Sequence, residues 1–132
     1  MNRYAMIFKV LSEEKRLKVL LLLLKSKGEY YVCEIADALG ENHYNVSKYL
    51  SELKREEIVK ERRVGKGVLY SIKEPDNEFK SYLFKALESI PDEYIKENLE
   101  LLNLRTRFRK ENRCVILKSH EWEKIIEKRD LL

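Results

Sequence analysis

The chain has 132 residues, of which 44% are hydrophobic and 38% are charged, and its formal net charge is +4. This length suits one compact domain, so we expect residues 1–132 to form a single unit. Because it has only two prolines and four glycines, the chain is predicted to be ordered and mostly helical. Glutamine is absent and charged residues are unusually frequent, a bias that predicts a thermophilic source.

Two properties argue against a membrane-bound or secreted protein. The longest unbroken apolar run, Val19–Leu24, is much shorter than the roughly 20 residues that span a bilayer. The N-terminus shows no charged segment followed by a cleavable apolar stretch, so we expect a cytoplasmic location without membrane contact. The two cysteines, Cys33 and Cys114, are too few for a disulfide scaffold.

Positive charge is concentrated in two segments. Residues 42–70 carry a net charge of +3 and residues 105–113 a net charge of +4, so the rest of the chain sums to −3. Such segregation suits a surface that binds phosphates, because each neutralised phosphate releases counterions. For the second segment the alternative is that its cations complement the dipole at the end of a helix.

Two helices are predicted before residue 28. The first is short and amphipathic, and it needs a partner surface. The second, over about residues 13–26, has Ser12 as its expected N-cap and Gly28 as its expected end. It is apolar nearly all round, which predicts burial on several sides. The apolar positions of the first helix are Tyr4, Ile7, Phe8 and Leu11.

A second helix pair follows after a short gap. Apolar residues recur at helical spacing from Val32 to Leu39 and stop at Gly40, and Asn42 can cap the next helix. Two short helices joined by a tight turn that contains glycine predict a helix-turn-helix, whose second helix enters the DNA major groove. The face of residues 42–56 opposite the apolar stripe consists almost entirely of hydrogen-bond donors and acceptors. The alternative for that face is an ordinary solvated helix surface.

A β-hairpin is predicted directly after this helix pair. Its arms are Ile58–Val64 and Val68–Ile72, joined by a glycine-rich turn. Val68, Tyr70 and Ile72 alternate and are expected to form the buried face, while basic residues lie on the arms and tip. A basic hairpin after a helix-turn-helix is typical of a winged helix, in which the wing contacts phosphates or the minor groove. The candidate DNA-contacting residues are Asn42, His43, Tyr44, Asn45, Ser47, Lys48, Arg55, Arg62, Arg63 and Lys66.

Three further helices are predicted after the hairpin. One ends before Pro91, and the next, over residues 92–110, is expected to be the longest helix of the chain. Its two apolar stripes imply two partners, so together with the N-terminal helix it is the predicted interface of a homodimer. Residues 111–132 form an extension whose helix begins after Ser119. The predicted fold is mostly α with a small β-hairpin, a winged helix-turn-helix in the order α-α-α-α-β-β-α-α plus a C-terminal helix, with a DNA-reading core at about residues 30–73.

Four segments, in this order, carry a further indication. They are Phe8-Lys9-Val10-Leu11-Ser12 leading into Arg16-Leu17, then Val32-Cys33-Glu34-Ile35-Ala36-Asp37-Ala38-Leu39-Gly40, then Val46-Ser47-Lys48-Tyr49-Leu50-Ser51-Glu52-Leu53-Lys54, and Arg62-Arg63-Val64-Gly65-Lys66-Gly67-Val68-Leu69-Tyr70. Over about residues 5–73 the chain thus resembles the ArsR family of small winged-helix repressors. The resemblance implies a homodimeric repressor that binds an inverted repeat and leaves it when a metal ion, metalloid or thiol-reactive signal binds.

The metal sites that this resemblance implies are incomplete. Many metalloid sensors of the family carry Cys-Val-Cys where this chain has Tyr31-Val32-Cys33. Another subgroup binds zinc through Asp and His on its last long helix, but residues 92–110 contain no histidine. Arg113-Cys114-Val115-Ile116 is similar to a Cys-Val-Val segment of some members, which implies that Cys33 and Cys114 could meet.

Three roles remain open for the two cysteines. A soft-metal site would need further ligands from His120, Glu121 or the second subunit. Oxidation to a disulfide or persulfide needs no third ligand. Both residues can instead be small core residues. The metal and any cofactor are therefore undetermined, and none is expected to be required for folding.

The sequence contains no motif that predicts an enzyme. It has no glycine-rich phosphate loop, and its acidic residues are not distinguishable from solvated charge. We therefore predict a dimeric DNA-binding transcriptional repressor that recognises an inverted repeat and is released by a thiol-reactive, soft-metal or metalloid signal. The alternative is a winged-helix module that binds proteins without reading DNA. Positive charge gathered around a polar helix face favours the first prediction.

Overall fold

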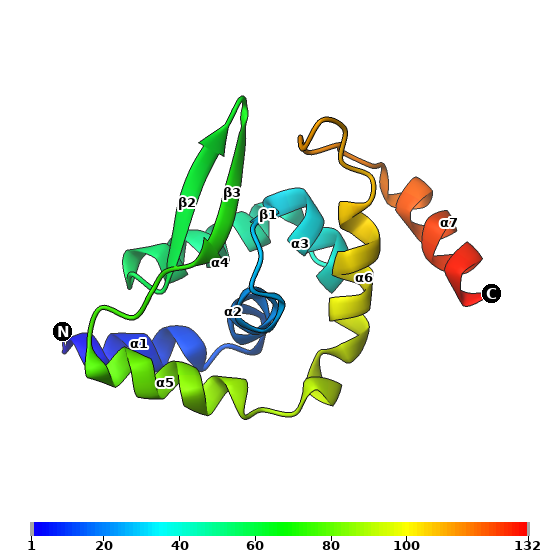
Figure 1. Ribbon diagram of the computed structural model, residues 1–132. Coiled ribbons are helices and arrows are strands. Elements are labelled where there is room, and N and C mark those ends of the chain that lie inside the picture. Colours follow the sequence, from blue (N-terminus) through cyan, green and yellow to red (C-terminus); the bar gives the residue numbers. More distant parts are fainter. Residues whose placement is uncertain (1, 132) are drawn as a thin grey trace.

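Figure 1 shows the computed structural model of the protein, which describes residues 2–131. Helices pack around a central helix, and a long β-hairpin projects from them. The elements are α1 (Arg3–Leu11), α2 (Glu14–Ser26), β1 (Tyr30–Tyr31), α3 (Val32–Leu39), α4 (His43–Arg55), β2 (Val59–Val64), β3 (Gly67–Ile72), α5 (Glu78–Glu88), the 3-10 helix η1 (Asp92–Tyr94), α6 (Lys96–Thr106) and α7 (Ser119–Asp130). The predicted mostly helical class and winged helix-turn-helix order are confirmed, and β1 and η1 are additions to them.

The core is built around α2, which is seen end-on in Figure 1. Residues 19–24 are each at most 5% exposed, because α1, α4, α5 and β3 all contact this helix. Burying one such leucine stabilises the fold by about 1.5–3 kcal/mol relative to leaving it exposed. The continuous apolar run therefore fixes α2 as the element on which the others pack.

The predicted range of α2 agrees with the structure to within one residue, but the residues at its two caps differ from those predicted. Ser12 is not its N-cap, because the Ser12 hydroxyl donates a hydrogen bond to the Lys9 carbonyl and so closes α1. Glu13 caps α2 instead, and its carboxylate accepts the Arg16 amide at 3.0 Å. At the other end, Lys27 takes the left-handed conformation (φ 59°) that was expected of Gly28.

α3 and α4 form the predicted helix-turn-helix. Gly40 ends α3 in the left-handed conformation (φ 66°), which glycine adopts without steric cost. Asn42 caps α4, since its side-chain oxygen accepts the amides of Tyr44 and Asn45. Val46 and the leucines of α4 are fully buried, so the opposite face of α4 is turned outward.

The hairpin belongs to a three-stranded antiparallel sheet in the order β1-β3-β2. β3 is central, and its predicted face packs on the main core; the difference from the prediction is that Leu69 on the opposite face is buried as well. Leu69 and Tyr70, which point to opposite faces of the strand, are both buried, whereas Val68 and Ile72 are only partly so. The reason is that Leu69 packs on Tyr31 and Cys33 in a small second cluster, on a face that a free hairpin would expose to water.

The predicted long helix over residues 92–110 is also wrong. Ile95 has φ −132° and ψ 20°, outside the helical region, so η1 and α6 are separate and α6 is shorter than α2 and α4. In each of its two predicted apolar stripes some residues are buried and others only partly so. Of the first stripe, Ile95 and Leu102 are buried and Leu99 is partly buried; of the second, Leu101 is buried and Leu104 and Phe108 are partly buried. Most of the contacts of α6 are with α3.

The C-terminal extension ends in α7, as predicted, with Lys118 as its N-cap in place of Ser119. Trp122 is buried, and its indole nitrogen donates to the Asp37 carbonyl at 3.0 Å. This bond places α7 against the end of α3. Within residues 2–131 no helix is both long and apolar enough to cross a membrane.

Candidate nucleic-acid interface

The outward face of α4 carries most of the predicted reading residues. Tyr44 is 76% exposed, Lys48 and Arg55 are exposed, and Asn45 and Ser47 are partly exposed. No side chain within residues 2–131 forms an ion pair with Lys48 or Arg55. The face is therefore available for hydrogen bonds to base edges and for contacts with phosphates.

Two of the predicted DNA contacts have structural partners within the chain. The side-chain oxygen of Asn42 is used by the helix cap. His43 Nε2 lies 3.2 Å from Asp37 Oδ1, so its ring connects the start of α4 to the end of α3. Both residues therefore stabilise the helix-turn-helix. For a contact with DNA, Asn42 still has its side-chain amide nitrogen and His43 its other ring nitrogen.

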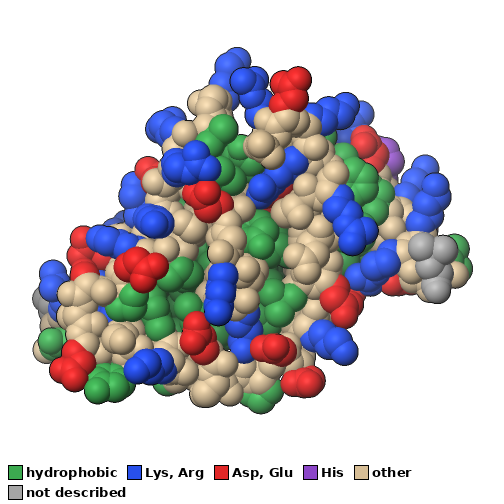
Figure 2. All heavy atoms as spheres, viewed as in Figure 1, with side chains coloured by type: hydrophobic (Ala, Val, Ile, Leu, Met, Phe, Trp, Pro, Cys, Tyr) green, Lys and Arg blue, Asp and Glu red, His purple; other side chains and the backbone are tan. Residues whose placement is uncertain are grey.

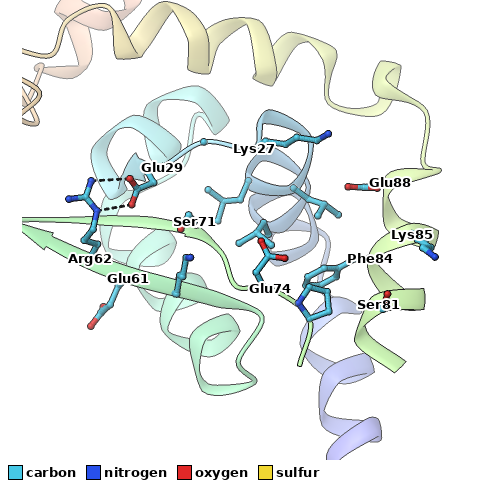
Figure 3. A pocket seen from close by; sticks show the side chains of 16 residues that line it. Lys27, Glu29, Glu61, Arg62, Ser71, Glu74, Ser81, Phe84, Lys85 and Glu88 are labelled. Carbon is cyan, nitrogen blue, oxygen red and sulfur yellow. Dashed lines mark hydrogen bonds and ion pairs between the residues drawn. The ribbon is translucent and has the colours of Figure 1, made fainter. Parts of the chain in front are cut away.

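The three predicted wing cations are not equivalent. Arg62 donates from Nε and Nη2 to the two carboxylate oxygens of Glu29, at 3.0 and 2.9 Å (Figure 3). These hydrogen bonds lower the pKa of Glu29 and raise the pKa of Arg62. Arg63 and Lys66 are exposed and, in the described part of the chain, have no ion-pair partner. In Figure 2, blue side chains of Lys and Arg surround the projecting wing.

The second basic segment, residues 105–113, is divided between the interior and the surface. Arg105 is fully buried, and its Nε donates to Asp37 at 2.7 Å. Arg109 donates to both carboxylate oxygens of the fully buried Glu34, at 2.7 and 2.6 Å. These two arginines therefore hold α6 and the segment after it to α3, as buried paired charges do, and do not face a phosphate.

Sequence reasoning missed this role of Glu34 and Asp37. Each acidic residue lies beside the apolar stripe of α3, where a charge needs a partner if it is buried. That position was the only indication in the sequence that these two residues would form buried ion pairs. The partners themselves lie about seventy residues further along the chain, so the sequence did not identify them.

The two cysteines are brought together. Cys33 in the first turn of α3 forms a disulfide with Cys114, across a sequence separation of 81 residues. Cys33 is 6% exposed and packs with Tyr31 and Leu69, so it also has the core position that was one of the alternatives. The side chains described here contain no group of three or more His, Cys, Asp or Glu arranged to hold a metal ion.

A groove of about 670 Å³ joins these features. Its floor includes His43 and Ser47 at the start of α4, one wall is the wing tip at residues 64–68, and the other wall is the segment 113–116. The wing tip and the segment before α7 stand at the same end of the molecule in Figure 1. The disulfide therefore lies in the wall of a groove that opens at the N-terminus of the predicted reading helix.

A larger hollow, of about 840 Å³, lies between α2, the base of the hairpin and α5 (Figure 3). Leu23 and Phe84 contribute apolar surface, and its rim mixes four basic with four acidic side chains. No charge of one sign dominates this hollow, and it includes no residue of α4. We therefore place the candidate interface at the groove.

Comparison with known proteins agrees with this geometry. Residues 13–61, which include the helix-turn-helix, match the pattern described as bacterial regulatory protein, arsR family. The chain is 35% identical over 66 residues to the arsenical resistance operon repressor of Escherichia coli, a match that spans 50% of this chain and 56% of that protein. It is 35% identical over 82 residues to a cadmium resistance transcriptional regulatory protein CadC homolog of Staphylococcus aureus, covering 62% of this chain and 65% of that protein. The chain thus spans little more than half the length of the first of these relatives.

Solved structures extend the similarity beyond the helix-turn-helix. The homodimeric winged helix-turn-helix DNA-binding domain of Mb0332 from Mycobacterium bovis, a possible ArsR-family transcriptional regulator, is 33% identical, with a TM-score of 0.55 over 71% of this chain and 82% of that one. The transcriptional regulator HlyU from Vibrio vulnificus is 26% identical, with a TM-score of 0.54 over 66% of this chain and 85% of that one. The chain belongs to the ArsR family of bacterial regulatory proteins.

Proposed function

We propose that this protein is a dimeric transcriptional repressor that reads an inverted repeat with α4. The observation that carries the proposal is the exposed polar face of α4 beside a wing whose tip bears unpaired cations. Asn45 and Tyr44 are assigned to base edges, and Ser47 and Lys48 to bases or nearby phosphates. Arg63 and Lys66 add affinity that does not depend on sequence. The ArsR family consists of regulatory proteins and not enzymes, which confirms the prediction of a non-enzymatic role.

The proposed dimer interface is an aromatic patch on α1 and α5. Tyr4, Phe8 and Tyr82 are 51%, 55% and 61% exposed, and Phe79 stacks edge-to-face on Tyr4 and Phe8, with ring centroids 4.9 and 5.8 Å apart. Large exposed apolar patches mark interaction sites, and one self-complementary patch suits a two-fold dimer. The patch keeps the predicted contribution of the N-terminal helix. The predicted contribution of residues 92–110 is smaller, because Leu101 and Leu102 of α6 are buried and Leu99 and Leu104 are partly buried.

The proposed signal acts on the Cys33–Cys114 pair. Oxidation of the two thiols forms the bond, and two protons and two electrons pass to the oxidant. The bond fixes residues 114–116, which follow the turn, in the wall of the groove that His43 and Ser47 also line. A DNA strand approaching the N-terminus of α4 then meets a rigid obstacle at these residues. A soft metal or metalloid that bridges both thiolates would have the same effect. The disulfide-bonded form is therefore assigned the lower affinity for DNA.

The function is tested with DNA from upstream of the protein's own coding region. The reduced protein is expected to protect two half-sites in a footprint, as a two-fold dimer requires. Replacing Asn45 with Ala should relax base preference at one position of each half-site, and each lost base contact costs about 1–3 kcal/mol of discrimination. Binding without base preference, or no protection of the DNA at all, would favour the protein-interaction module instead.

A further inference from the structure

A second small turn stands at the groove, across from the wing tip. Lys110 and Arg113 form a β-bridge, with the two N–O distances 3.3 and 2.9 Å. The two residues between them, Glu111 and Asn112, both have positive φ, 52° and 62°. This is the backbone of a tight two-residue hairpin turn, formed here by residues other than glycine at some steric cost.

The turn is held in this strained form by contacts of the residue just before it and of the turn itself. Arg109, just before it, pairs with the buried Glu34 and donates to the Glu29 carbonyl at 2.8 Å. The Tyr31 hydroxyl donates to the carbonyl of Asn112 at 2.8 Å. All of these contacts precede Cys114, so the position of the turn does not depend on the disulfide alone.

The cations at the turn take no part in these contacts. Arg107, Lys110 and Arg113 are exposed and have no ion-pair partner within residues 2–131. Glu111 is the acidic residue among them, so residues 107, 110, 111 and 113 together carry a surplus of positive charge. Arg113 lines the same groove as Lys66 of the wing tip and Ser47 of α4. The start of the reading helix is therefore flanked by cations from two separate hairpin turns.

We propose that residues 107–113 form a second basic arm that contacts the phosphate backbone of duplex DNA on the side of α4 opposite the wing. The inference rests on the proposed DNA binding and adds a contact surface outside the helix-turn-helix and the wing. Because the backbone of the turn is already ordered, its cations lose only side-chain conformational entropy when they meet a phosphate. Strained backbone that the surrounding contacts over-determine is typical of functional segments.

The arm is tested by the salt dependence of binding to the promoter DNA under reducing conditions. The double variant Lys110→Ala and Arg113→Ala should reduce the slope of log K against log salt by about 3.6, since two contacts are lost in each of the two subunits and each contributes roughly 0.9. The matched control is Lys124→Ala with Lys128→Ala, which removes the same charge from exposed positions on α7. The control should keep the wild-type slope.

A further variant separates the position of the arm from its charge. Tyr31→Phe removes the hydrogen bond to Asn112 without changing any charge, and it should weaken DNA binding by a few fold under the same conditions. An arm variant with the slope of the wild type, or a control with an equal loss, would overturn the arm and leave the reading helix and wing unaffected. If the wild type fails to bind the DNA at all, the proposed function falls together with the arm.

Discussion

Arg62 and Arg63 are neighbours on β2, yet only one of them is free to meet DNA. The side chain of Arg62 is tied to Glu29 by two hydrogen bonds, so a phosphate has to compete with a carboxylate for it. Because the pKa of Glu29 is lowered in the folded chain, this ion pair is intact at neutral pH and is lost as the pH falls through that lowered pKa. At neutral pH the wing therefore offers Arg63 and Lys66 to phosphates, while Arg62 remains bound to Glu29.

Replacing Glu29 with Gln is expected to strengthen DNA binding by a few fold at low salt. The change frees Arg62 for a phosphate and removes one negative charge near the wing. Fluorescence anisotropy with labelled DNA measures the effect. The control is Glu93→Gln, which alters the net charge equally at an exposed residue of η1. Weaker binding by the Glu29 variant, or equal gains in both variants, would show that Arg62 is not held back by Glu29.

At the scale of elements, the two acidic residues of α3 tie the reading motif to the C-terminal half of the chain. Asp37 accepts from Arg105 on α6, lies against His43 of α4, and through its carbonyl accepts from Trp122 of α7. Glu34 accepts from Arg109 just after α6 and also from the Tyr31 amide. α3 is therefore the element through which movement of the C-terminal segment would reach α4.

Replacing Asp37 with Ala should destabilise the fold strongly. The change leaves Arg105, which is fully buried, as an uncompensated charge, at a cost of about 3–5 kcal/mol. Thermal unfolding followed by circular dichroism should show a drop in Tm on the order of 10–20 °C.

Two further variants make this measurement decisive. Glu97→Ala breaks the solvent-exposed pair with Arg129 and should leave Tm nearly unchanged. Asp37→Ala combined with Arg105→Met should recover part of the loss, because the buried charge that lost its partner is then removed as well. If the Asp37 variant were as stable as the Glu97 control, Asp37 would not be the partner that stabilises Arg105.

At the scale of the whole molecule, the aromatic patch on α1 and α5 is the surface expected to join two chains. Phe8→Glu places a charge in the patch and should shift the protein toward a monomer in sedimentation velocity experiments. Leu131→Glu is the control, since it makes the same kind of change at an apolar residue that is 86% exposed and lies outside the patch. A Phe8 variant that remains dimeric would place the interface elsewhere.

Local patterns predicted the helix-turn-helix and the hairpin, because Asn42, Gly40 and the apolar stripes act within a few residues. The predictions were wrong or incomplete where contacts between distant parts of the chain determine the structure. Tyr31 pairs as a strand only because Leu69 lies opposite it. Ile95 is buried with a non-helical backbone, and this interrupts the predicted helix between η1 and α6. The burial of Arg105 depends on Asp37, 68 residues earlier in the chain. None of these partners could be read from sequence spacing.

The candidate site shows the same division. The exposed face of α4 was predicted from periodicity, and its exposure agrees with that prediction, while its contacts with DNA remain a prediction. The groove that joins Ser47, Lys66 and Cys114 was not predicted, because it brings together three segments that are far apart in the chain. The meeting of Cys33 and Cys114 was implied only by resemblance, and the disulfide now provides the structural basis for it.

The central claim is that α4 reads DNA and that the state of Cys33 and Cys114 controls this reading. The most direct measurement is a titration of promoter DNA and of shuffled DNA of equal length, at one salt concentration, with the dithiol and the disulfide-bonded protein. The reduced protein should bind the promoter at least about 10³-fold more tightly than the shuffled DNA, and the disulfide should lower promoter affinity about tenfold or more. Equal affinity of the reduced protein for both DNAs, or equal promoter affinity in the two states, would contradict the account.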